Sequence, residues 1–136
     1  MNNRELIIKA LEARKYSYSP YSGFAVGAAL LCADGTVYTG CNIENSAFSP
    51  TNCAERTAFF KAVSEGKRGF VGIAVVGGES QYDEPQAICP PCGVCRQVMK
   101  EFCSQDFQII LAKNADEYKV MTLSELLPMS FDKREV

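Results

Sequence analysis

The sequence predicts an α/β fold, a three-layer α-β-α sandwich around a mixed sheet of roughly five strands. The main observation is the order in which helical and extended patterns follow one another along the chain, α-ββ-α-β-α-β-β-α. The second is size: 136 residues with 47% hydrophobic content can bury one compact core. We therefore expect residues 1–136 to form a single domain, with helices on both faces of the sheet.

The chain begins with a predicted helix followed by a predicted hairpin. Residues 3–15 carry apolar side chains at helical spacing, with charged residues between them. Small and branched apolar residues at 24–32 predict a buried strand. Asp34-Gly35 favours a tight turn, so residues 36–42 are expected to return antiparallel to that strand.

A second helix is expected at about residues 50–65. Ser49 suits the N-cap and Pro50 the first helical position. Asn52 with Glu55 three residues later also fits a capping box, so the sequence leaves two starting points open. The remaining expected elements are a strand at 70–76, a helix at about 93–103, strands at 107–112 and 118–121, and a short helix at 123–127 capped by Thr122.

Composition restricts the chemistry. The chain has no histidine, which excludes histidine bases and histidine metal ligands, and leaves carboxylates, thiols or metal-bound water for acid–base work. The net charge of −2 and the lack of a basic stripe weigh against nucleic-acid binding. There is no apolar run long enough for a membrane span and no signal-peptide pattern at the start, so we expect a cytosolic protein without a membrane partner.

Three cysteines and one carboxylate indicate a metal site. Cys92 and Cys95 form a C-x-x-C pair, and Cys53 lies 92 − 53 = 39 positions upstream, within reach only through the fold. Three thiolates leave one position of a tetrahedral zinc open, and that is where catalytic zinc holds water. Glu55 follows Cys53 by two residues, and at a helix start both could reach a site beyond the helix end. We therefore predict zinc with Glu55 as the proton carrier.

Other interpretations of the same residues remain open from spacing alone. Cys89-Pro-Pro-Cys92 is a second C-x-x-C, so Cys89 could close a structural zinc site, or the cysteines could form a redox pair. Glu55 could simply cap a helix. Arg56 could be a solvated helix charge, although we expect it to donate hydrogen bonds to the thiolates.

Three further residues are candidates for binding a ligand. Asn42 and Glu44 alternate at the end of the second expected strand, so both can point to one face. Together they offer a donor and an acceptor to a sugar hydroxyl, although an exposed loop would look the same. Phe24 starts the first strand, where its ring could either join the core or line a cleft.

Four motifs in order resemble the small, homotetrameric cytidine deaminases. They are Phe24-Ala-Val-Gly-Ala-Ala-Leu, Asn42-Ile-Glu44-Asn, Cys53-Ala-Glu55-Arg-Thr-Ala and Pro91-Cys92-Gly-Val-Cys95-Arg-Gln97. The resemblance runs from the first helix to Leu127-Pro128. It implies a zinc-dependent hydrolytic deaminase that converts cytidine and deoxycytidine to uridine and deoxyuridine and releases ammonia, in pyrimidine salvage.

The resemblance also implies a role for individual residues. Cys53, Cys92 and Cys95 would hold one zinc ion per subunit, and Glu55 would move protons. The base edge would be held by the Ala54 N–H and Glu55, with Phe24 packed on the base and Asn42 with Glu44 on the ribose 3′-hydroxyl. Neighbouring subunits would complete the site with Phe48, where relatives commonly carry Tyr, and with Phe131.

Two rival functions stand beside this expectation. A deaminase for a modified cytosine nucleoside, of the blasticidin type, would use the same motifs. A non-catalytic binding module stabilised by zinc would instead close the metal site with Cys89 and admit no water.

Overall fold

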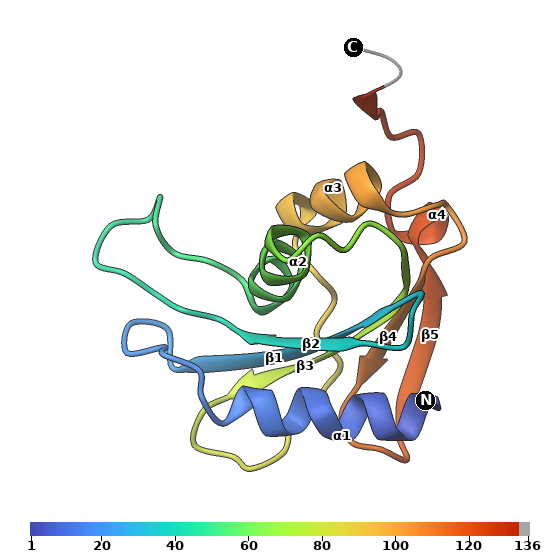
Figure 1. Cartoon of the computed structure of the whole chain (residues 1–136). Coiled ribbons are helices and arrows are strands. Elements are labelled where there is room, and N and C mark those ends of the chain that lie inside the picture. Colours follow the sequence, from blue (N-terminus) through green and yellow to red (C-terminus); the bar gives the residue numbers. More distant parts are fainter. Residues whose placement is uncertain (134–136) are drawn as a thin grey trace.

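The computed structural model describes residues 1–133 as one sheet covered by helices (Figure 1). The elements in order are α1 (Asn3–Arg14), β1 (Phe24–Cys32), β2 (Val37–Cys41), α2 (Ala54–Ser64), β3 (Phe70–Glu79), α3 (Gly93–Phe102), β4 (Gln108–Ala112), β5 (Tyr118–Thr122) and α4 (Leu123–Leu126). This is the predicted order. None of the helices within the described residues has the length and apolar character needed to cross a bilayer.

The five strands form one mixed sheet in the order β2-β1-β3-β4-β5. β1 pairs antiparallel with both β2 and β3, and β4 pairs antiparallel with β5. Only β3 and β4 run parallel, and α3 makes the crossover between them. The predicted mixed, roughly five-stranded sheet is confirmed.

The helices form separate layers on the two faces of the sheet (Figure 1). On one face α1 buries Ile7 and Ala10 with strand residues such as Ile110. On the other face α2 and α3 bury Phe59 and Met99 together with the opposite side chains of the strands. Because side chains alternate along a strand, one sheet supplies both cores. The predicted three-layer sandwich is confirmed.

The turn between β1 and β2 agrees with the prediction. Thr36 N–H donates to the Asp34 carboxylate at 3.0 Å, and Gly35 has a positive φ of 91°. Glycine adopts this left-handed conformation without steric cost. The turn therefore fixes the antiparallel register of β2 on β1.

The predicted start of the second helix is wrong. Its N-cap is Cys53, so neither Pro50 nor an Asn52–Glu55 capping box begins it. Asn52 instead exchanges two backbone hydrogen bonds with Ile43, each 2.9 Å long, which hold it in an extended pairing. The helix can begin only after that bridge, and this delay places Cys53 and Glu55 at the helix tip.

The third strand is longer than predicted. The predicted strand ended at residue 76, but Gly77 and Gly78 pair with Val26 and Ala25 of β1 and continue β3 to Glu79. A side chain at Gly77 would meet the Cys89 sulfur at 2.8 Å. The glycine thus allows the segment before α3 to cross closely over the strand.

Arg14, at the end of α1, joins four segments of the chain. Its guanidinium is buried and donates to five backbone carbonyl oxygens at 2.9–3.2 Å. These carbonyls belong to Ala25 at the start of β1, Gly78 and Glu79 at the end of β3, and Tyr82 and Asp83 in the loop that follows. Arg14 therefore fastens the loop after β3 to the rest of the sheet.

Candidate active site

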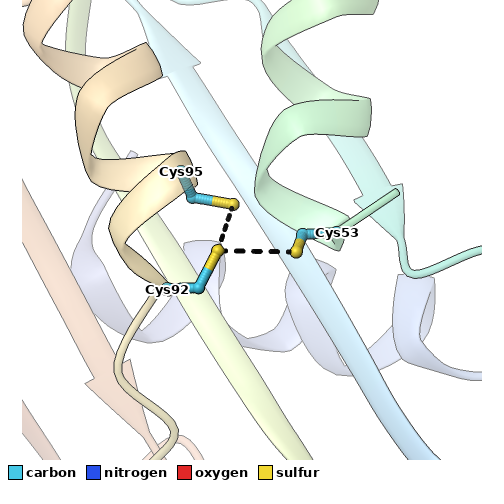
Figure 2. A group of neighbouring side chains, drawn as sticks. All are labelled: Cys53, Cys92 and Cys95. Atoms are coloured by element: carbon cyan, nitrogen blue, oxygen red, sulfur yellow. Dashed lines mark hydrogen bonds between the residues drawn. The ribbon is translucent and has the colours of Figure 1, made fainter. Parts of the chain in front are cut away.

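The tips of two helices bring three cysteines together (Figure 2). Cys53 is the N-cap of α2, Cys92 is the N-cap of α3, and Cys95 lies in the first turn of α3. The Sγ atoms of Cys53 and Cys92 are 3.7 Å apart, and those of Cys92 and Cys95 are 3.5 Å apart. All three sulfurs lie within 4.8 Å of one another. The fold thus brings Cys53 next to Cys92, although 39 positions separate them in the sequence.

The spacing of the sulfurs suits zinc. Zn–S bonds of about 2.3 Å at tetrahedral angles put ligand sulfurs about 3.8 Å apart, close to the 3.7 and 3.5 Å observed. Within the described residues the cluster contains these three cysteines and no fourth ligand. Cys89 stays outside it, and all seven cysteines are free thiols. The geometry therefore disagrees with a zinc site closed by Cys89.

The surroundings of the cluster favour negative charge on sulfur. Helix N-termini stabilise thiolates, and Arg56 Nη2 donates to Cys53 Sγ at 3.2 Å. A hydrogen bond from Cys95, and then that of Arg56, lower the pKa of Cys53 to about 5. The hydrogen bond to Cys53, together with burial, raises the pKa of Cys95. The hydrogen bond to Cys53 thus places the Arg56 guanidinium beside the cysteine cluster, while its Nε is buried with no partner among the described residues.

Glu55 lies at the second position of α2 and is 4% exposed. Burial raises the pKa of its carboxyl to about 7, because the charged form loses its hydration. A carboxyl with such a pKa can both accept and donate a proton near neutral pH. Glu55 is therefore suited to acid–base chemistry, which a solvated capping carboxylate would not be.

A pocket of about 320 Å³ opens beside the cluster. It brings together every residue of this chain that was expected to contact substrate, apart from the two distant aromatics: Phe24, Asn42, Glu44, Ala54 and Glu55. Cys53 and Cys92 form part of its wall. Asn42 and Glu44 thus face one cavity, as their alternation predicted.

Several lining residues were not predicted from the sequence. They are Ser22, Val26, Thr51, Asn52, Cys89 and Pro90. Ser22 contacts two of the candidate ligand-binding residues, since its hydroxyl donates to the Glu44 carboxylate and accepts from Phe24 N–H. In the sequence Ser22 belongs to a run of turn-forming residues before β1, and such a run does not predict which residues its side chain contacts.

Phe48 and Phe131 do not line the pocket of their own chain. Phe48 is 96% exposed in the segment between β2 and α2, which extends away from the sheet (Figure 1). Phe131 is 58% exposed and follows α4. Its carbonyl accepts from Gln97 of α3 at 3.2 Å, and the next residue, Asp132, lies 3.9 Å from Lys100. Helix α3 therefore holds the segment that carries Phe131.

Comparisons with known proteins show the family to which the chain belongs. Residues 1–111 match the family described as cytidine and deoxycytidylate deaminase zinc-binding region. Cytidine deaminases of Sporosarcina psychrophila and Halalkalibacterium halodurans are each 48% identical over 136 residues, covering all of this chain and 96% and 98% of theirs. The crystal structure of cytidine deaminase from Burkholderia pseudomallei is 43% identical with a TM-score of 0.87, covering 96% of this chain and all of that one.

The cytidine deaminase structure from Mycobacterium tuberculosis is also similar, with 36% identity, a TM-score of 0.80 and coverage of 96% and 98% of the two chains. A zinc-binding family model over most of the chain and a three-cysteine cluster with zinc-like spacing together assign one zinc ion to each subunit. The chain is an enzyme of hydrolytic deamination, and it belongs to the zinc-binding cytidine deaminase family.

Proposed function

We propose that this enzyme deaminates free cytidine and deoxycytidine in pyrimidine salvage. The charge of the pocket lining supports this proposal. It holds two carboxylates, Glu44 and Glu55, and its described lining contains no lysine, arginine or histidine. A phosphorylated substrate would meet negative charge without a cation to pair with. The family model covers both cytidine and deoxycytidylate deaminases, and this charge pattern favours the nucleoside over the nucleotide.

In the proposed reaction water replaces the amino group at C4 of cytosine, so a C–O bond forms, the C–N bond breaks, and ammonia leaves. Zinc, when bound by Cys53, Cys92 and Cys95, would lower the pKa of the attacking water. Glu55 would take a proton from the attacking water, deliver one to ring N3 and help protonate the departing amine. Its raised pKa of about 7 fits both directions of transfer.

The remaining lining residues would hold the substrate. Ala54 is the first residue of α2, where backbone N–H groups have no partner within the helix, so its N–H is available to the base. Phe24 would pack on the base, and Asn42 with Glu44 would hold the 3′-hydroxyl. Because ribose and 2′-deoxyribose share that hydroxyl, both nucleosides should be substrates.

We also propose that the enzyme is a homotetramer in which Phe48 and Phe131 reach the pockets of neighbouring subunits. Their exposure supports this, because aromatic side chains are enriched at protein–protein interfaces relative to the rest of the surface. Sedimentation of the purified zinc enzyme should give about four times the chain mass of 14.9 kDa. A monomer at assay concentrations would contradict the shared site. Location in the cytoplasm stays a prediction.

The test of substrate is an assay of the zinc enzyme with cytidine, deoxycytidine, deoxycytidylate and blasticidin S, following ammonia release. We expect turnover of the first two and at least a hundredfold lower kcat/KM for deoxycytidylate, because an unpaired phosphate would lie beside carboxylates. Turnover of blasticidin S without turnover of cytidine would support the rival deaminase instead. Deoxycytidylate as the best substrate would overturn the argument from pocket charge.

A further inference from the structure

The loop between α1 and β1 holds the Glu44 carboxylate in place. Glu44 Oε1 accepts from the backbone N–H groups of Tyr21 and Ser22 at 3.0 and 3.1 Å, and Oε2 accepts from the Ser22 hydroxyl. The Ser22 hydroxyl lowers the pKa of Glu44, so the group stays ionised and can only accept hydrogen bonds. Three donors from one loop fix a side chain that would otherwise lose rotamer freedom when substrate binds.

The neighbouring amide of Asn42 has a fixed orientation as well. Its Oδ1 accepts from Val26 N–H at 2.9 Å and from the Ser17 hydroxyl, and its Nδ2 donates to the Phe24 carbonyl at 2.8 Å. An amide oxygen has two lone pairs and an amide nitrogen has two hydrogens. The oxygen is therefore fully used, and one N–H remains for a ligand. Turning the amide over would set like groups against Phe24 and Val26.

One fixed acceptor beside one fixed donor matches a hydroxyl group. A hydroxyl gives its hydrogen to the carboxylate and accepts the amide N–H with its oxygen. A hydrogen atom at the same sugar position offers neither bond. An ester there has no proton to give, so the carboxylate would be buried without its partner. Discrimination of a hydroxyl from a hydrogen atom or an ester at this sugar position thus depends on the Glu44 carboxylate being fixed as an acceptor before the ligand binds.

We propose that Ser22 is a positioning residue for this hydroxyl recognition: it holds Glu44 as the acceptor for the sugar 3′-hydroxyl. The inference rests on the proposed function, because it takes a nucleoside as the ligand. Ser22 acts through Glu44 and does not itself touch the reacting atoms. Its hydroxyl also accepts from Phe24 N–H at 3.0 Å, so the test must separate an effect on the sugar from an effect on the base.

The test compares 2′-deoxycytidine with 2′,3′-dideoxycytidine, which differ only in the 3′-hydroxyl. For Ser22→Ala we expect about a tenfold loss of kcat/KM with deoxycytidine, mainly through KM, the effect of one weakened hydrogen bond. With dideoxycytidine the variant and the parent should agree within about twofold, since no hydroxyl is left to be recognised. Ser22→Thr, which keeps the hydroxyl, should restore the parent KM for deoxycytidine.

Ser19→Ala is the matched control, because it removes a serine hydroxyl from the same loop that lies against Ser17 and not against Glu44. It should leave both substrates unaffected. Equal losses of Ser22→Ala on both substrates would place its effect on Phe24 or on general stability and overturn the proposal. Unchanged kcat/KM with deoxycytidine would overturn it too. Failure of the parent enzyme to turn over either nucleoside would instead overturn the proposed function.

Discussion

The sequence predicted some of the side chains in the candidate site and missed others. The cluster of Cys53, Cys92 and Cys95 was predictable because residue type and spacing already restrict the chemistry, whereas the role that the resemblance assigns to Glu55 stays a prediction. Ser22 was not, because its contact with Glu44 joins residues 22 positions apart through a loop without regular structure. The raised pKa of Glu55 also could not be predicted from the sequence, because it results from burial of the carboxyl in the fold.

Glu55→Gln should separate binding from chemistry. The amide has nearly the same shape but cannot carry a proton, so kcat should fall by about 10²–10⁴-fold. Zinc content and the thermal unfolding midpoint should stay close to those of the parent, because Glu55 is not among the clustered sulfur ligands. Near-normal turnover by a zinc-loaded variant would contradict the proton-carrying role.

Cys92→Ala should lose metal and activity together. Two thiolates cannot hold zinc as three do, and metal binding is coupled to folding, so the unfolding midpoint should fall as well. Cys89→Ala is the matched control: it removes a nearby thiol outside the cluster and should keep one zinc per chain. Elemental analysis of both variants decides the ligand set. Stoichiometric zinc in Cys92→Ala, or its loss in Cys89→Ala, would contradict the assignment.

At the level of helices and strands, local patterns predicted which elements exist and where most of them begin, but not the start of α2 or the end of β3. The start of α2 depends on the bridge between Asn52 and Ile43, which no local pattern reveals. The extension of β3 through Gly77 and Gly78 depends on pairing with β1. In both places a non-local hydrogen bond overrode a local preference. The cap of the last helix at Thr122 was predicted correctly, because a capping box is local.

Gly40 of β2 should be intolerant of a side chain. A Cβ there would lie 2.4 Å from the Ala54 carbonyl oxygen and 2.7 Å from the Ala58 nitrogen, both in α2. Gly40→Ala should therefore push α2 away from the sheet and lower the free energy of unfolding by ~1–3 kcal/mol. Because α2 carries Glu55 at its tip, kcat should fall as well. Urea unfolding and the nucleoside assay measure the two effects.

Gly93→Ala is the comparison for that variant. Gly93 begins α3, and a Cβ there would meet no atom within 4 Å. Alanine should be tolerated or stabilise the helix by ~0.5–1 kcal/mol, because glycine loses more conformational freedom on folding. Similar free energies of unfolding for Gly40→Ala and the parent would show that α2 can shift at little cost.

For the molecule as a whole, the alternation of elements predicted three layers and a mixed sheet, and the structure confirms both. The strand order could not be read from the sequence, because it depends on which edges pair. The homotetramer stays a prediction that rests on the resemblance alone, because the sequence around Phe48 and Phe131 does not show whether either side chain contacts a neighbouring subunit.

Alkaline conditions should destabilise the fold through thiols that are buried or partly buried. Burial raises the pKa of Cys103 from 9.0 to about 12, and it also raises the pKa values of Cys32 and Cys41. A thiol with a raised folded-state pKa contributes stability that is complete below the unfolded pKa and is lost as pH rises through the folded one. The urea midpoint should therefore hold below about pH 9 and fall between about 9 and 12. Cys103→Ala should flatten the fall, and an unchanged midpoint up to pH 11 would contradict the linkage.

Arg14 joins distant segments of the chain by hydrogen bonds, where many small proteins use a disulfide. Small folds often rely on cystine cross-links to hold distant loops, whereas here one guanidinium ties two strand ends, a helix and a loop without any redox chemistry. None of the seven cysteines forms a disulfide, and all are free thiols. The chain can be kept fully reduced, which is the state in which three of its sulfurs are able to capture a metal.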